Sequence, residues 1–161
     1  MNKLYTKGYF QCSWKFQTNK ERLLELVNLI RELRPDSVLD VGCGRGFLVR
    51  DLNLAGIKTK GCDFAEYAII KKVHPDCVLA DAKELLYKDK EFDLVISTDF
   101  FEHIEEKELD KVWNEMRRVG HRVAARIATS EENPKKNDYH VTVNPKVWWQ
   151  ERFPELIILR T

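Results

Sequence analysis

The sequence predicts an α/β protein with a doubly wound, mostly parallel sheet of about six or seven strands and helices on both faces. Three observations predict this class. Short runs rich in β-branched residues alternate with amphipathic stretches at helical spacing. Two runs, Ser37 to Val41 and Phe92 to Asp99, contain consecutive apolar and β-branched residues, which is typical of strands buried on both faces. The first run ends in an acidic residue and a glycine-rich turn, as expected where a buried strand leads into a helix.

The expected elements follow the chain in order. Asn19 can cap a first helix, which Pro35 ends. Strands are predicted at 37–41, 57–62, 77–80, 92–99, 122–129 and 156–159. Helices are predicted at 47–55, 66–72 and 107–119, and another begins at 144–145, where a proline suits the first turn. Glu102 and His103 are expected to open the helix at 107–119.

Length and charge limit the classes of function. A chain of 161 residues is expected to form one domain over 1–161, and its aromatic residues 1–18 are expected to form a flap or a lid. The net charge of +1 gives no general attraction to nucleic acid or to an acidic membrane surface. The expected partner is therefore a small molecule rather than a polyanion.

The cysteines indicate the compartment. The sequence has four cysteines without C-x-x-C pairing: Cys12, Cys43, Cys62 and Cys77. It shows neither a signal peptide nor a long apolar segment. We expect reduced thiols in a cytoplasmic protein, and we expect no zinc or other metal site.

The turn after the first strand predicts the ligand. Gly42, Gly44 and Gly46 are spaced two apart, so they do not form the dinucleotide motif G-x-G-x-x-G. Asp40, two places before the first glycine, would repel a pyrophosphate and suits a ligand with an amino group. The run Asp40-Val41-Gly42-Cys43-Gly44-Arg45-Gly46 resembles the first motif of class I S-adenosylmethionine-dependent methyltransferases. The resemblance implies a Rossmann-like fold, S-adenosylmethionine (SAM) as cofactor and S-adenosylhomocysteine (SAH) as product, with Asp40, Gly42, Cys43 and Gly44 at the cofactor.

Two further strand ends extend this resemblance. Asp63 ends the next predicted strand, where an acidic side chain can accept hydrogen bonds from the ribose hydroxyls of an adenosine ligand. Phe64 can lie against the adenine or pack in the core. Asp81 and Ala82 resemble the position at which the family reads the adenine amine and ring, although a strand-end aspartate is also a common cap.

The run Phe-Asp-Leu-Val followed by Asp99-Phe100-Phe101-Glu102-His103 resembles the fourth-strand motif of the same family. The resemblance places the strand end, Thr98 and Asp99, beside the methionine part of the cofactor. The residues just after it face the substrate cleft. His103 is the first candidate for the group that takes the acceptor's proton, and His140 is the second. Alternatively, His103 is a histidine at a helix start whose hydrogen bonds are satisfied within the protein. Glu102 beside it is expected at a helix N-terminus from the helix dipole alone, without a role in catalysis.

The acceptor is predicted from a second resemblance. His140 and Thr142, with the later pair Trp148 and Trp149, resemble an arrangement in small methyltransferases that modify glycans or small metabolites. One of the two tryptophans is expected in the core and one at the cleft rim. The family's sheet usually has a seventh, reversed strand, and only about six strands fit this sequence. Either the last strand is missing, or a partner covers the sheet edge, as in a homo-oligomer.

Two other functions stay open. A SAM-binding module without catalytic activity would keep the same cofactor residues. Asp99-x-x-Glu102-His103 with His140 resembles the Glu-x-x-Glu-His…His site that holds a divalent ion in RNA 2′-O-methyltransferases. Asp99 stands where that site has a glutamate, and the sequence lacks a basic track for RNA.

Overall fold

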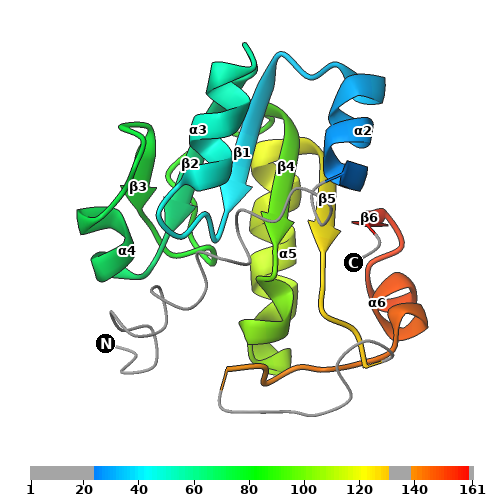
Figure 1. Cartoon of the computed structure of the whole chain (residues 1–161). Helices are drawn as coiled ribbons and strands as arrows, with labels where there is room; N and C mark the ends of the chain where they lie inside the picture. The colour runs from blue at the N-terminus through cyan, green and yellow to red at the C-terminus, as the bar shows by residue number, and fades with distance from the viewer. Residues whose placement is uncertain (1–23, 131–138, 160–161) are drawn as a thin grey trace.

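The computed structural model describes residues 24–130 and 139–159. Over these residues the chain forms a six-stranded sheet in the order β3-β2-β1-β4-β5-β6 (Figure 1). Every neighbouring pair of strands is parallel, which confirms the predicted fold class. The strands are β1 (Ser37–Val41), β2 (Lys58–Asp63), β3 (Cys77–Leu79), β4 (Phe92–Thr98), β5 (Gly120–Arg126) and β6 (Leu156–Leu159). The helices are α2 (Leu24–Leu33), α3 (Phe47–Leu54), α4 (Glu66–Ile70), α5 (Leu109–Val119) and α6 (Lys146–Arg152), with 3-10 turns η1 (Phe101–His103) and η2 (Glu106–Glu108).

The strand order reverses between β1 and β4. The chain builds β2 and β3 on one side of β1, then crosses to β4 on its other side and continues outward to β5 and β6. Asp40 of β1 lies in register with Gly61 of β2 and with Ile96 of β4. In an open parallel sheet the crevice at such a reversal, beyond the carboxyl ends of the strands, is the usual ligand site. The arrowheads of β1 and β4 point to this edge in Figure 1.

Apolar residues cover both faces of the sheet. On one face, α2 and α3 pack Leu26, Ile30 and Leu52 against the sheet. On the other, α5 buries all four residues of its predicted apolar face: Leu109, Val112, Trp113 and Met116. Trp149 and Phe153, from the region of α6, complete this second cluster. The prediction that one tryptophan lies in the core is confirmed by Trp149, which has no exposed surface.

Several predicted bounds differ from the structure by one or two residues, and the differences around α5 and β5 bear on the site. Glu102 and His103 do not open α5; they lie in the separate turn η1. β5 begins at Gly120 rather than Arg122, because α5 runs directly into the strand, and it ends at Arg126 rather than Thr129. A Cβ at Gly120 would lie 2.4 Å from the Val95 side chain, so only glycine fits this tight junction.

Some expectations fall outside the described residues. These are the N-terminal flap at 1–18, the cap at Asn19 and most of the loop before residue 139. Among the described residues no seventh strand is present, and β3 and β6 form the two edges of the sheet. No helix in the described ranges is both long and apolar enough to span a bilayer.

Candidate active site

The glycine turn lies directly after β1. Gly42, Gly44 and Gly46 all have positive φ, at 77°, 55° and 79°, a conformation that side chains with a Cβ rarely adopt. The amides of Gly42 and Cys43 donate to the carbonyl of Cys62 at 2.9 and 3.0 Å, so the turn is held against the end of β2. The Cys43 thiol is buried and donates to the Gly44 carbonyl at 3.6 Å.

The turn also packs against the segment that follows β4. A Cβ added at Gly42 would lie 2.4 Å from the ring of Phe100, well inside van der Waals contact. Phe100 immediately precedes η1, the turn that carries Glu102 and His103. The glycine turn and the turn η1 are therefore neighbours in the structure.

Asp63 connects the glycine turn to the end of β2. One carboxylate oxygen accepts from the Gly44 amide at 2.8 Å, and the other accepts from the Ala65 amide, also at 2.8 Å. Burial raises the pKa of Asp63, and these two hydrogen bonds oppose that shift. Each carboxylate oxygen has a second lone pair. Asp63 can thus accept from ribose hydroxyls while it holds the turn.

Asp40 is a buried carboxyl group next to the glycine turn, and its surroundings show whether this site fits SAM. It is 2% exposed, and its Oδ1 has no hydrogen-bond partner within the described ranges. Burial, followed by the nearby Cys77 and Asp63, raises the pKa of Asp40 well above its usual value. A buried carboxylate oxygen without a donor is costly, and an ammonium group would satisfy it. The buried carboxylate beside this turn therefore fits a ligand with an ammonium group, such as the methionine part of SAM.

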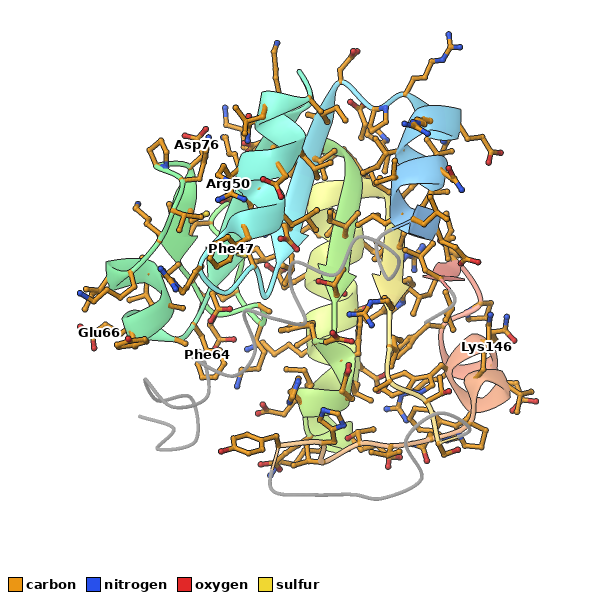
Figure 2. All side chains as sticks on the ribbon, in the orientation of Figure 1. Phe47, Arg50, Phe64, Glu66, Asp76 and Lys146 are labelled. Carbon is orange, nitrogen blue, oxygen red and sulfur yellow. The ribbon has the colours of Figure 1, made fainter. Side chains whose placement is uncertain are left out.

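Phe64 and Asp81 mark the expected adenine region. Phe64 is 45% exposed, so the alternative that it packs in the core is wrong. In Figure 2, Phe64 lies toward the edge of the sheet where the strands end. Asp81 is exposed and its carboxylate caps the Lys83 amide at 2.9 Å, which is the capping role that the sequence left open. Ala82 beside it is half-buried.

The end of β4 contains a feature that sequence reasoning missed. Asp99, just after Thr98, has a φ of 50° and pairs with the guanidinium of Arg126 at the end of β5. Arg126 is 3% exposed, and its Nε and Nη1 have no hydrogen-bond partner among the described residues. An arginine inside the apolar run Val123 to Ile127 was the available signal, since a buried guanidinium needs an acidic partner.

The two candidate histidines are in contact. The rings of His103 and His140 meet edge to face with centroids 4.9 Å apart. Burial lowers the pKa of both imidazoles, so each is neutral near pH 7. Glu102 is fully buried beside them, and burial together with the charge of Asp99 raises the pKa of Glu102 to about 8.

Comparisons with known proteins agree with this geometry. A family model described as a methyltransferase domain matches residues 39–122, just over half of the chain. A SAM-dependent methyltransferase from Archaeoglobus fulgidus and a protein from Pyrococcus horikoshii OT3 are each 29% identical, with TM-scores of 0.55 and 0.54. Both alignments cover 71% of this chain and 54% of the other.

A rat relative matches over a shorter part of the chain. The mitochondrial arginine-hydroxylase NDUFAF5 of Rattus norvegicus is 37% identical over 65 residues, which cover 37% of this chain and 19% of the relative. The chain thus spans about half the length of the two solved structures and a fifth of the rat protein. The family resemblance and the cofactor prediction are confirmed: this chain belongs to the class I, S-adenosylmethionine-dependent methyltransferases.

Proposed function

We propose that this chain transfers the methyl group of SAM to a hydroxyl of a small-molecule or glycan-type acceptor and releases SAH. The oxygen lone pair forms the new bond to the methyl carbon, and the electrons of the C–S bond return to sulfur. The hydroxyl proton leaves to a base or to solvent. Such a transfer disperses charge rather than creating it, so positioning of the acceptor supplies most of the catalysis.

The contact of His103 with His140 is the observation that carries this proposal. His103 lies in η1, shortly after the carboxyl end of β4, and Phe100, which precedes η1, packs against Gly42 of the glycine turn. A neutral imidazole can accept a proton from an acceptor hydroxyl, which supports His103 as the base and His140 as the second candidate.

Asp40 and Asp63 are proposed to hold the cofactor. Asp40 is the buried carboxylate that suits the amino group of SAM, and Asp63 suits the ribose hydroxyls. The bare backbone at Gly42 and Gly44 allows close approach, with Cys43 between them. Thr98 and Asp99 border the methionine part, and Phe64, Asp81 and Ala82 border the adenine. When bound, SAM supplies an electrophilic methyl group next to the acceptor.

A pair of variants tests the division of roles. His103→Ala should lower the rate of SAH formation by about 100-fold or more while the affinity for SAH stays near wild type, because general base catalysis contributes on that scale. Asp63→Ala should weaken SAH binding. His121→Ala, at an exposed histidine on β5, is the matched control and should leave the rate unchanged. Equal loss of SAH affinity in the His103 and Asp63 variants would contradict the assignment.

The remaining open functions are separated by the same assay. No SAH formation with any acceptor, together with tight SAM binding, would favour a binding module without catalysis. Methylation of RNA, but of no small molecule or glycan, would overturn the proposed acceptor class. The net charge of +1 argues against RNA, since binding to a phosphate backbone needs basic residues.

Location and assembly are also proposals. The free thiols of Cys43, Cys62 and Cys77 support a cytoplasmic location. β3 and β6 are the edge strands of the sheet among the described residues, and a second copy of the chain is the proposed occupant of one edge. Sedimentation of the purified chain tests this oligomer.

A further inference from the structure

We propose that Glu102, His103 and His140 bind one divalent first-row transition-metal ion. Each residue offers one ligand atom, and these three atoms lie within 4.8 Å of one another. Two imidazoles and one carboxylate form a donor set that suits Zn²⁺, Mn²⁺, Co²⁺ or Fe²⁺. Three protein ligands leave at least one coordination position for another molecule. This proposal departs from the preferred expectation of no metal site, and it uses three of the four ligands of the RNA-methyltransferase alternative without its acceptor.

The backbone brings the two parts of the site together. The amides of Val141 and Thr142 both donate to the carbonyl of Glu102, at 2.9 and 3.1 Å. The Thr142 hydroxyl, which is nearly fully buried, donates to the carbonyl of Ile104 at 2.6 Å. These bonds hold His140, which directly precedes Val141, against η1. The three ligands are thus positioned by the fold rather than gathered by flexible side chains.

Glu102 supplies an independent sign of a missing cation. It has no exposed surface, and its Oε1 accepts from the Ala128 amide at 3.2 Å. Its Oε2 is buried and has no hydrogen-bond partner in the described part of the chain. The guanidinium of Arg126 is paired with Asp99 instead. A buried carboxyl oxygen that lacks a partner costs about 1–3 kcal/mol, and a metal ion, which replaces the carboxyl proton, is a partner that removes this cost.

His103 is oriented as metal-binding histidines usually are. Its Nδ1 lies 2.8 Å from the carbonyl oxygen of Tyr139. A carbonyl only accepts, so Nδ1 carries the proton and the lone pair lies on Nε2. A backbone carbonyl that fixes the tautomer in this way is a common outer-shell partner of a metal-binding imidazole.

The size of the cluster fits an ion after a small adjustment. On a tetrahedral ion with metal–ligand bonds of about 2.0–2.2 Å, two ligand atoms are about 3.3–3.6 Å apart. Ligand atoms that lie within 4.8 Å of one another must therefore close by at most about 1.5 Å, a movement shared between two side chains. Asp99 stays outside the set because it is paired with Arg126.

The ion would deepen the proposed function, on which this step rests. A hydroxyl bound at the open position loses its proton more easily, so the oxygen that attacks the methyl group is more nucleophilic at neutral pH. The proton passes to water, the O–C bond forms, and the C–S bond breaks toward SAH. In this version His103 and His140 activate the acceptor through the ion rather than by taking its proton themselves.

Metal titration tests the site without any assay of activity. The purified chain is treated with EDTA, dialysed, and titrated with MnCl₂ by calorimetry and with CoCl₂ by visible absorption. We expect one ion per chain, and at least a 100-fold weaker affinity in His140→Ala and in Glu102→Gln, since even outer-shell changes cost about 10–100-fold. His121→Ala should bind as wild type does. Absence of stoichiometric binding, or binding that survives both ligand variants, would overturn the proposal.

Because Glu102 is buried, the urea midpoint of each variant is measured first. His140 is only half-buried, so His140→Ala keeps the test valid if Glu102→Gln does not fold. Metal binding without SAH formation would uphold the metal site and contradict the proposed function. SAH formation that persists at full rate after EDTA treatment would contradict the metal's role and would leave His103 as the base.

Discussion

Gly42 offers a quantitative test of how tightly the glycine turn packs against the segment after β4. In Gly42→Ala the new Cβ would lie 2.4 Å from Phe100, and the backbone would have to keep a φ of 77°. The left-handed conformation costs about 1–2 kcal/mol for a residue with a Cβ. Because Phe100 is 8% exposed and must move by about 1 Å to restore ordinary contact, overpacking adds about 1–3 kcal/mol. The expected loss in free energy of unfolding is therefore about 2–5 kcal/mol.

Gly56→Ala is the matched control for this variant. Gly56 has a φ of 86°, but an added Cβ would meet no atom within 4 Å. It should lose only the conformational part, about 1–2 kcal/mol. Urea unfolding followed by circular dichroism measures both variants, and calorimetry with SAH should show weaker binding only for Gly42→Ala. Equal losses of stability in the two variants would refute the argument that Phe100 packs on the turn.

Two other predictions concern the buried charges. Burial raises the pKa of Asp40 above its unfolded value, so its contribution to stability is complete at low pH and is lost as the pH rises above about 4. Without cofactor, the fall in free energy of unfolding between pH 4.5 and pH 8 should therefore be smaller in Asp40→Asn than in wild type. Urea unfolding at several pH values measures this, and the same dependence of the free energy of unfolding on pH in both proteins would contradict it. Asp99→Asn removes the charge that compensates the buried guanidinium of Arg126 and should cost about 3 kcal/mol. Asparagine tolerates the positive φ of this position, so the backbone adds little to that cost. Asp51→Asn breaks the exposed pair with Arg50 and should cost less than about 1 kcal/mol, so similar urea midpoints for the two variants would disprove the buried ion pair.

Much of the fold follows from local patterns in the sequence. The strands at Ser37–Val41 and Leu156–Leu159 lie where their β-branched runs predict them. The buried face of α5 follows from helical spacing alone. The start of β5 does not, because a helix that passes straight into a strand at Gly120 depends on the packing of Val95 below it.

The site was predicted less completely than the fold. The glycine turn and Asp63 are close in sequence, so their spacing predicts their meeting. The contact between His103 and His140 joins segments almost 40 residues apart, and it depends on backbone bonds from Val141 and Thr142 that no local pattern encodes. The break between η1 and α5 matters for the same reason, since a continuous helix would direct Glu102 and His103 elsewhere.

Calorimetry on the purified chain tests most directly which ligand the glycine turn accepts. Titration with SAM and with SAH should each release or absorb heat at one molecule per chain, and Asp40→Asn should weaken both. Heat with a nicotinamide dinucleotide, and none with SAM or SAH, would contradict the account.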